Sequence, residues 1–290
     1  MHNFNKISVF GGTGFIGGRF CEMFPEECVR IPYDNREPET NNVLYFISTV
    51  HNYNVFDNPH LDINTNLNVL MNVLESCRKQ NREGLVFNFI SSWFVYGKTK
   101  DLPAREDSYC EPKGFYSITK RTAEQLIISY CETFNINYRI LRLCNIYGTA
   151  DIKASKKRNA LQFLTGEIVN NRDINLYDRG ENIRDFMHVE DVCRAIYLII
   201  NEASLNEIIN VGSGIPHKFI DIMTYVKERT NSTSTFNFID PPEFHKIVQV
   251  QDMYLDVTKL KNLNFKPKYA IWDGIDILTL ANKNKKRNKK

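Results

Sequence analysis

Residues 6–17 read Lys-Ile-Ser-Val-Phe-Gly-Gly-Thr-Gly-Phe-Ile-Gly, and this stretch decides the fold. The β-branched and aromatic run Lys6–Phe10 predicts a strand, and glycines at 11, 14 and 17 predict a turn that opens a helix. In this spacing the first glycine permits a tight turn, the second lets a pyrophosphate approach the backbone, and the third lets the helix pack on the strand. Free N–H groups at the helix start favour phosphates. The predicted dinucleotide contacts here are Gly11, Gly14, Phe15 and Ile16.

An acidic residue follows 23 positions after the first glycine, at the end of a second predicted strand over Val29–Tyr33. Asp34, with Asn35 beside it, is placed to bind both hydroxyls of an adenosine ribose. A carboxylate repels a 2′-phosphate, so Asp34 favours NAD over NADP. Arg30 and Arg36 are close enough in sequence to attract that phosphate, which keeps NADP open as the alternative.

Ser92, Tyr116 and Lys120 give a second signal, for proton transfer. Tyr116 and Lys120 are four residues apart in a predicted helix and therefore share one face. Ser92 follows a buried strand, at the edge where ligands sit in open α/β sheets. A nearby ammonium and a cationic nicotinamide would lower the pKa of the phenol from its ordinary value of about 10. We therefore expect Tyr116 to exchange a proton with a substrate oxygen held by Ser92, and Lys120 to contact the nicotinamide ribose as well.

Strands and helices alternate through the first half of the chain. Apolar strands over 43–48, 85–90 and 138–143 alternate with helices over 61–79 and 115–134. The alternation predicts an α/β fold, a Rossmann-like doubly wound parallel sheet with a smaller C-terminal substrate-binding lobe. The predicted parts are a dinucleotide-binding domain at 1–147 with 189–212 returning to it, a lobe from 148–188 and 213–280, and a basic disordered tail at 281–290.

Composition narrows the class of protein. The chain has 290 residues, 42% of them hydrophobic, and no apolar run approaches the roughly 20 residues that cross a bilayer. Seven scattered cysteines without a C-x-x-C pair argue against a disulfide framework or a metal site and predict a cytoplasmic location. Six of the last eight residues are Lys or Arg. We expect this run to be a solvated tail rather than a nucleic-acid or membrane contact.

An ordered series of further motifs runs along the chain. The pieces are Gly11–Gly17, Asp34-Asn35, Asn66 ahead of Leu74-Glu75, Ser92 with Val95-Tyr96-Gly97, Tyr116–Lys120, Leu141–Gly148, Arg184–Val189 with Asp191, and Asn210–Gly214. Over about residues 6–280 the chain resembles the extended short-chain dehydrogenase/reductase family, specifically its NAD-dependent nucleotide-sugar epimerases, dehydratases and reductases.

This resemblance implies roles for residues that spacing alone does not assign. Asn145 and Arg184 match residues that contact the diphosphate region of a nucleotide-diphosphate sugar, and a guanidinium suits a phosphate. The alternative for Arg184 is a surface salt bridge with Asp185 or Asp191. Those two acids are themselves expected to fix loops or cap a helix. The resemblance also implies a homodimer, formed through the helices at 61–80 and 114–134.

Three positions depart from the family pattern. Only eight residues, 35–42, separate Asp34 from the next strand, which is too few for the usual crossover. We therefore expect the third strand and its helix to be missing, the adenine to be more exposed and the cofactor to be held less tightly. Trp93 and Phe94 stand where dehydratases of the family carry an Asp-Glu pair, and neither can transfer the protons of a 4,6-dehydratase. Trp93 is expected to pack against a sugar or to fill the core.

The third departure lies near the C-terminus and concerns the nucleotide base. The segment 243–252 lacks an arginine often found there, and His245, Lys246 or Gln249 could substitute. The base is therefore left open. The leading interpretation is an NAD-dependent nucleotide-sugar 4-epimerase that acts through a 4-keto intermediate. The alternatives are an NAD(P)H-dependent reductase of 4-keto-6-deoxy sugar nucleotides and, from another class, a non-catalytic binding protein of the same shape.

Overall fold

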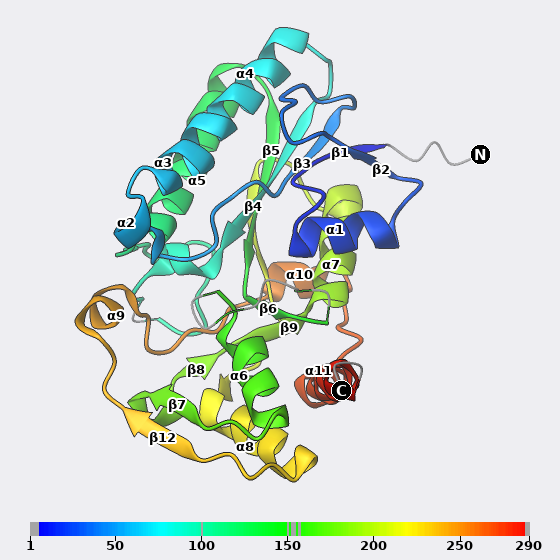
Figure 1. Cartoon of the computed structure of the whole chain (residues 1–290). Helices are drawn as coiled ribbons and strands as arrows, with labels where there is room; N and C mark the ends of the chain where they lie inside the picture. Colours follow the sequence, from blue (N-terminus) through cyan, green and yellow to red (C-terminus); the bar gives the residue numbers. More distant parts are fainter. Residues whose placement is uncertain (1–5, 100, 150, 152–154, 156–157, 288–290) are drawn as a thin grey trace.

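A six-stranded sheet forms the centre of the molecule (Figure 1). The computed structural model describes residues 6–99, 101–149, 151, 155 and 158–287. The strands are β1 (Ile7–Phe10), β2 (Cys28–Arg30), β3 (Asn42–Tyr45), β4 (Val86–Ser92), β5 (Asn137–Leu143) and β10 (Glu207–Val211). Their order is β10-β5-β4-β3-β1-β2, and every neighbouring pair is parallel. The predicted parallel α/β sheet is confirmed.

Helices cover both faces of this sheet. They are α1 (Phe15–Met23), α4 (Val69–Gln80), α5 (Phe115–Thr133) and α7 (Val189–Glu202). On one face α4 and α5 bury side chains such as Leu74 and Ile127 against the strands. On the other face α1 and α7 bury Phe20 and Ile196. Figure 1 shows the two helix pairs on opposite sides of the sheet, so the doubly wound arrangement is confirmed.

The connection between β2 and β3 lacks the usual third strand and helix. β2 lies at the edge of the sheet, and β3 lies on the other side of β1. Residues 31–41 join the two without any helix or strand. The connection is tied to β1, because the backbone N–H groups of Glu39 and Thr40 each donate to Ser8 Oγ at 2.9 Å. The predicted loss of this unit is confirmed.

Two elements end differently from their sequence predictions. The second strand stops at Arg30 rather than Tyr33, and Pro32 has no N–H to extend the ladder. The helix predicted over 61–79 is divided into α3 (Leu61–Ile63), a π turn η1 (Asn64–Asn68) and α4, after the short α2 (Asn54–Asp57). Within η1, the Asn66 side chain accepts from the Thr49 N–H at 2.8 Å and donates to Thr119 Oγ at 2.8 Å. The π turn therefore directs a polar side chain inward, a use of π turns that is frequent at functional sites.

A smaller lobe lies below the carboxyl ends of the sheet strands (Figure 1). Its strand pairs are β6 (Asn145–Tyr147) with β9 (Phe186–His188), β7 (Ile174–Tyr177) with β12 (Phe236–Ile239), and β8 (Ile183–Arg184) with β11 (His217–Lys218). Its helices are α6 (Ala160–Val169), α8 (Phe219–Thr230) and α9 (Glu243–Val248), while α10 (Thr258–Asn262) packs beside β10. A separate apolar core holds the lobe together.

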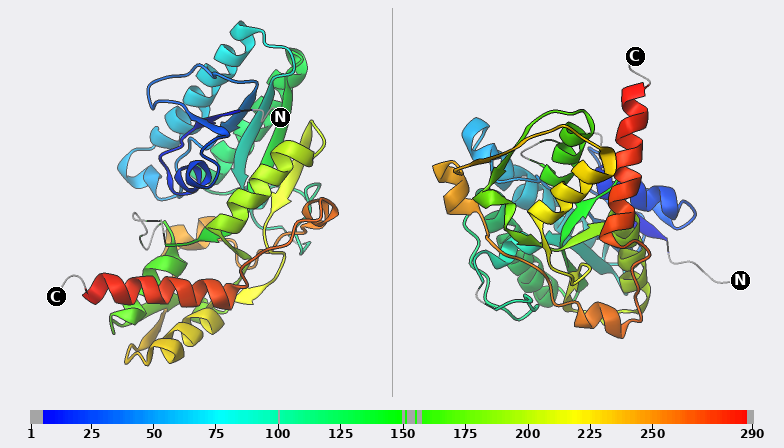
Figure 2. Two further views of the ribbon diagram at one scale, coloured as in Figure 1. Left: turned by 90° about the vertical axis from the view of Figure 1, so that its right-hand side faces the viewer. Right: turned by 90° about the horizontal axis from the view of Figure 1, so that it is seen from below.

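The predicted disordered tail at 281–290 is wrong over most of its length. Helix α11 runs from Ile271 to Arg287, and residues 288–290 lie outside the described part of the chain. Figure 2 shows this helix lying along the lobe beside α6 and α8. The helix is anchored by buried Ile275 and Leu278, and Lys and Arg are good helix formers that suit a helix C-terminus. Within the described residues, every helix is too short or too polar to cross a bilayer.

Gly17 lies so close to the backbone of the glycine turn that an added methyl group should lower the free energy of unfolding there but not at Gly18. A Cβ on Gly17 would lie 2.5 Å from the Gly11 carbonyl oxygen, whereas one on Gly18 would come no closer than 3.6 Å to any atom. We expect Gly17→Ala to lower the free energy of unfolding by about 1–3 kcal/mol. Gly18→Ala should leave it equal or raise it by about 0.5–1 kcal/mol, because alanine favours a helix interior. Denaturant unfolding measures both, and equal stability of the two variants would contradict the packing described.

Candidate active site

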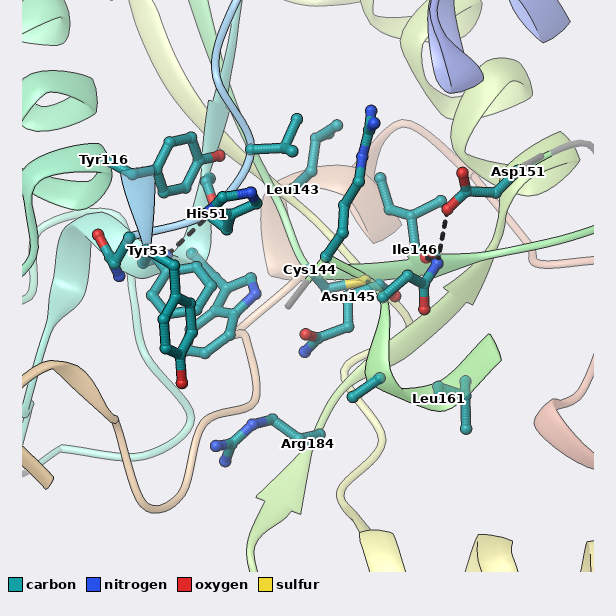
Figure 3. A pocket seen from close by; sticks show the side chains of 18 of the residues that line it. His51, Tyr53, Tyr116, Leu143, Cys144, Asn145, Ile146, Asp151, Leu161 and Arg184 are labelled. Atoms are coloured by element: carbon teal, nitrogen blue, oxygen red, sulfur yellow. Dashed lines mark hydrogen bonds between the residues drawn. The ribbon is translucent and has the colours of Figure 1, made fainter. Parts of the chain in front are cut away.

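A cavity of about 690 Å³ lies between the carboxyl ends of β3 and β4 and the lobe (Figure 3). This volume is typical of ligand sites. The sheet side of its lining comes from the glycine turn, residues 48–53 and residues 90–94, and the lobe side from α6, β7 and α9. Ionisable Lys, Arg, Asp and Glu side chains in the lining are Lys120, Asp151, Arg158 and Arg184. The lining therefore carries more cationic than anionic groups and suits an anionic ligand.

The glycine turn has the shape of a phosphate cradle. Gly11 has φ +79°, a conformation that favours glycine, and α1 begins directly after Gly14. Gly11, Gly14, Phe15 and Ile16 all line the cavity, as the sequence predicts. A Cβ on Gly11 would press against Phe46 Cβ at 3.1 Å. The turn thus offers backbone N–H groups at a helix start without side chains in the way, which is what a dinucleotide pyrophosphate needs.

Asp34 and Asn35 are not brought to this cavity. β2 ends at Arg30, and Asp34 is an exposed turn residue four positions later. The Asn35 side chain accepts the Glu37 N–H at 2.9 Å and so fixes the local turn. The residue that lies against the glycine turn is Arg30, whose Cγ is 3.2 Å from the place of a Cβ on Gly12. The spacing from Gly11 favours Asp34, whereas Pro32 is the sequence signal that the strand ends before it.

Ser92, Tyr116 and Lys120 all line the cavity. Burial raises the pKa of Tyr116 to about 12, and the Ser92 hydroxyl opposes this rise. Burial lowers the pKa of Lys120 to about 7, opposed by the negative charge of Glu124. The Lys120 ammonium donates to the Ile90 carbonyl oxygen at 2.6 Å and lies 4.4 Å from the ring centroid of Phe89. The three predicted proton-transfer residues therefore lie at one wall of one cavity.

Asn145 and Arg184 lie on the lobe side of the cavity. The Asn145 amide donates to the Asp185 carbonyl oxygen at 3.1 Å. The buried guanidinium of Arg184 donates to backbone carbonyl oxygens of Ile183, Val250 and Gln251. Burial lowers the pKa of Arg184 to about 10. Among the described residues its hydrogen bonds go to carbonyl oxygens, while the carboxylates of Asp252 and Asp178 act on its charge without a hydrogen bond to it.

The two acids named as alternative partners of Arg184 have structural roles. The Asp185 carboxylate accepts the N–H groups of Ser213 and Gly214, each at 3.0 Å. The Asp191 carboxylate accepts the N–H groups of Lys268 and Tyr269, each at 2.9 Å. The prediction that both acids fix loops is confirmed, and neither appears among the hydrogen-bond partners of the Arg184 guanidinium.

Trp93 and Phe94 form an aromatic wall beside the proton-transfer residues. Their rings are stacked with centroids 3.9 Å apart, and Phe94 meets the Tyr116 ring edge-on at 6.0 Å. The Arg184 guanidinium carbon lies 5.4 Å from the centroid of the Trp93 ring. Trp93 is buried in the core, which confirms one of the two roles considered for it, and it is also part of the cavity lining.

The cavity lining also contains candidates for contacting the nucleotide base, and residues that the sequence did not predict. His245 and Gln249 line it, whereas Lys246 pairs with Glu243 at 2.6 Å. The His245 ring lies 4.7 Å from that of Tyr177, and its Nδ1 is 3.0 Å from the Tyr53 hydroxyl oxygen. Additional lining residues without a sequence signal are His51, Tyr53, Arg158, Asn159 and Tyr177. In the described part of the chain no three His, Cys, Asp or Glu side chains gather in a way that could hold a metal.

Comparison with known proteins identifies the family. The model of the NAD dependent epimerase/dehydratase family matches residues 42–212, and the chain belongs to this family. A relative named "Putative UDP-glucose 4-epimerase" from Methanocaldococcus jannaschii is 27% identical over 245 residues, which cover 84% of this chain and 78% of the relative.

Two solved structures share the fold across nearly the whole chain. UDP-glucose 4-epimerase from Thermotoga maritima, solved with UDP-glucose, superposes with a TM-score of 0.86 at 21% identity and covers 98% of this chain and 99% of its own. RMD from Pseudomonas aeruginosa, solved with NADPH, has a TM-score of 0.84 at 18% identity and covers 97% and 99%. These TM-scores show that the chain shares the fold of both proteins over nearly its whole length.

The burial of Lys120 predicts a pH-dependent contribution to stability. Its pKa of about 7 lies below the value near 10.4 of an unfolded lysine, so between these values the unfolded chain binds the extra proton. Stability from this residue therefore rises as pH increases through that window. Relative to Lys120→Met, the wild-type protein should gain free energy of unfolding between about pH 7 and about pH 10. Denaturant unfolding of both proteins tests this, and a difference that does not change with pH would contradict it.

Proposed function

We propose that the protein is an NAD-dependent nucleotide-sugar 4-epimerase that works through a 4-keto intermediate. The observation that carries the proposal is that Ser92, Tyr116 and Lys120 share one cavity with the buried cation of Arg184. The first three residues suit the oxidation of an alcohol, and the fourth suits a phosphate. A nucleotide sugar has both groups in one molecule.

The glycine turn would hold the cofactor. Its lining residues Gly11 and Gly14 leave room for a pyrophosphate at the start of α1. NAD bound there would supply the acceptor and the donor of a hydride. Arg30 beside the turn supports NADP as the alternative cofactor, while the exposed Asp34 remains the proposed ribose contact only if residues 31–41 move toward the turn.

Proton transfer falls to Tyr116. As a phenolate it would take the proton of the sugar hydroxyl while Ser92 holds the oxygen, and it would return a proton to the ketone in the second half of the reaction. The Lys120 ammonium, one helix turn away, would stabilise the phenolate. Trp93 and Phe94 supply no acid or base, which separates the proposed activity from 4,6-dehydration.

The phosphate end of the substrate would lie against Arg184 and Asn145. Arg184 presents a buried guanidinium that hydrogen-bonds only carbonyl oxygens in the described residues, so its charge is available to an anion. Arg158, which also lines the cavity, adds a second cation. All seven cysteines are free thiols, which fits the proposed cytoplasmic location.

A reductase of 4-keto-6-deoxy sugar nucleotides is the second candidate. Burial raises the pKa of Tyr116 to about 12, so the phenol is protonated at neutral pH. A protonated phenol is the form that donates to a ketone, and this favours reduction. The same residues would serve, with NADPH or NADH consumed.

Turnover at C4 tests the function. UDP-, dTDP-, GDP- and CDP-hexoses are first screened for thermal stabilisation, and binders are incubated with NAD while NMR follows inversion at C4. Tyr116→Phe should lower turnover by about 10²- to 10⁴-fold and keep NAD-induced stabilisation, because only the proton-transfer group is lost. Tyr130→Phe, on the same helix and bonded to Glu75, is the matched control and should turn over normally.

The outcomes of this experiment distinguish the epimerase from the reductase and from a non-catalytic binding protein. Stoichiometric loss of reduced cofactor with a 4-keto sugar, without epimerisation, would replace the epimerase by the reductase. Wild-type turnover in Tyr116→Phe would rule out the proton-transfer role. Binding without any turnover would leave a non-catalytic binding protein.

We also propose a homodimer through the helices at 61–80 and 114–134. Exposed apolar side chains on these segments are Leu61, Ile63, Phe115, Ile118, Leu126 and Phe134. Clustered exposed apolar groups mark interaction surfaces. Leu126→Glu should convert a dimer to a monomer in light scattering, whereas Ile277→Glu, an equally exposed apolar residue on α11, should not. A wild-type mass of one chain would contradict the proposal.

A further inference from the structure

Glu124 is a buried carboxylate that the proposed reaction does not use. It lies on α5, one turn beyond Lys120 and two turns beyond Tyr116, and its side chain is 0% exposed. Its two oxygens accept four hydrogen bonds, from Ser91 Oγ at 2.6 Å, Arg142 Nε at 3.0 Å, Arg142 Nη2 at 2.8 Å and Arg121 Nη1 at 2.9 Å. The carboxylate thus joins α5 to both β4 and β5.

The same face of α5 meets the end of β4 at successive residues. Lys120 donates to the carbonyl oxygen of Ile90, and Glu124 accepts from the hydroxyl of Ser91. Tyr116 faces Ser92, whose hydroxyl lowers the pKa of the Tyr116 phenol. Positions i, i+4 and i+8 of the helix are therefore matched to neighbouring positions of the strand. A rotation or shift of α5 would separate all three pairs together.

Arg142 extends this anchoring away from the cavity. Its guanidinium carbon lies 4.7 Å from the centroid of the Tyr96 ring, and its Nη1 donates to the Glu106 carbonyl oxygen at 3.1 Å. The Tyr96 hydroxyl in turn donates to Asn210 Oδ1 on β10 at 2.6 Å. Arg142 is 1% exposed, so its position is fixed from every side.

We propose that Glu124 is the positioning residue of the proton-transfer set: it fixes the register of α5 against β4 and supplies the buried negative charge that faces Lys120. The proposal rests on the proposed function for its effect on turnover, but its electrostatic part concerns the protein alone. A buried carboxylate that loses its charge leaves neighbouring cations uncompensated.

The charged groups around Glu124 determine in which direction loss of its charge shifts the pKa of Lys120. Glu124 faces Lys120 and Arg121 on α5 and Arg142 on β5, while the thiol of Cys110 lies on the far side of Arg142. Tyr116 faces Ser92 and the carboxylate of Asp62. The charge of Glu124 opposes the lowering of the Lys120 pKa by burial, so removing that charge should lower the pKa of Lys120 further. A neutral Lys120 no longer attracts the phenolate, and the pH needed to ionise Tyr116 should rise.

The experiment compares Glu124→Gln with a matched control. Asp276→Asn removes a carboxylate that pairs with Arg229 and accepts from Tyr225 in the lobe, far from the cavity. NMR titration of the lysine side chains, assigned with Lys120→Met, should show the Lys120 midpoint lower by about one pH unit in Glu124→Gln and unchanged in Asp276→Asn. Turnover should fall by about 10- to 100-fold with the pH profile moved to higher pH and KM nearly unchanged, and Glu124→Asp should recover part of the loss.

The proposal fails if Glu124→Gln folds with the Lys120 midpoint and the pH profile of the wild type. If Glu124→Gln does not fold, Ser91→Ala decides, because it removes one hydrogen bond to the carboxylate and leaves both arginines paired. Ser91→Ala should lower turnover by about 3- to 10-fold with normal substrate binding, and wild-type turnover would overturn the proposal. Absence of any turnover in the wild type overturns the proposed function, while the Lys120 titration still decides the role of Glu124.

Discussion

The pairing of β4 between β3 and β5 is the constraint on which the rest of the structure depends. All seven residues of β4 are buried, and it is hydrogen-bonded in parallel to both neighbours. A parallel strand with covered faces leaves its carboxyl end as the place where polar groups can reach a ligand. Ser92 stands at that end, and α5 packs on β4 so that Tyr116 and Lys120 reach the same point. The geometry of the site is therefore a consequence of strand register.

Local patterns predict the elements well where one pattern dominates. The apolar runs at 85–90 and 138–143 predict β4 and β5 to within two residues at each end, and the glycine turn opens α1 as its spacing requires. The predictions are wrong where a contact between residues far apart in sequence determines the local backbone structure. Asn66 bonds to Thr49 in the loop after β3 and to Thr119 on α5, and these contacts accompany a π turn where periodicity indicates a continuous helix. The basic run is helical as far as Arg287, because buried side chains in the first half of α11 anchor the helix.

The residues of the site also divide into those that local motifs predict and those that they do not. Motifs with fixed spacing predict Ser92, Tyr116, Lys120 and the cavity-lining glycines, since each lies on an element whose position follows from the sheet. His51, Tyr53, Arg158 and Tyr177 carry no such motif, because loops and the lobe bring them to the cavity only after the chain has folded. The Tyr53 hydroxyl, for example, meets His245 across 192 positions of sequence. Asp34 has the expected spacing, but β2 ends four residues before it and the residue does not line this cavity, so its ribose contact stays a prediction.

Burial explains how the site can move a proton without creating a net charge. Desolvation raises the pKa of Tyr116 and lowers that of Lys120, so it disfavours the ionised form of each residue taken alone. Transfer of a proton from the phenol to the amine turns two neutral groups into a phenolate and an ammonium, which keeps the total charge of the cavity wall constant. The desolvation cost of an isolated ion is then shared by an ion pair with a fixed geometry. Glu124 and Arg142 pair with each other behind Tyr116 and Lys120, at 2.8 Å, and Arg184 lies on the lobe side of the same cavity. The groups that would exchange a proton are therefore separate from the cation that we propose for the anionic end of a ligand.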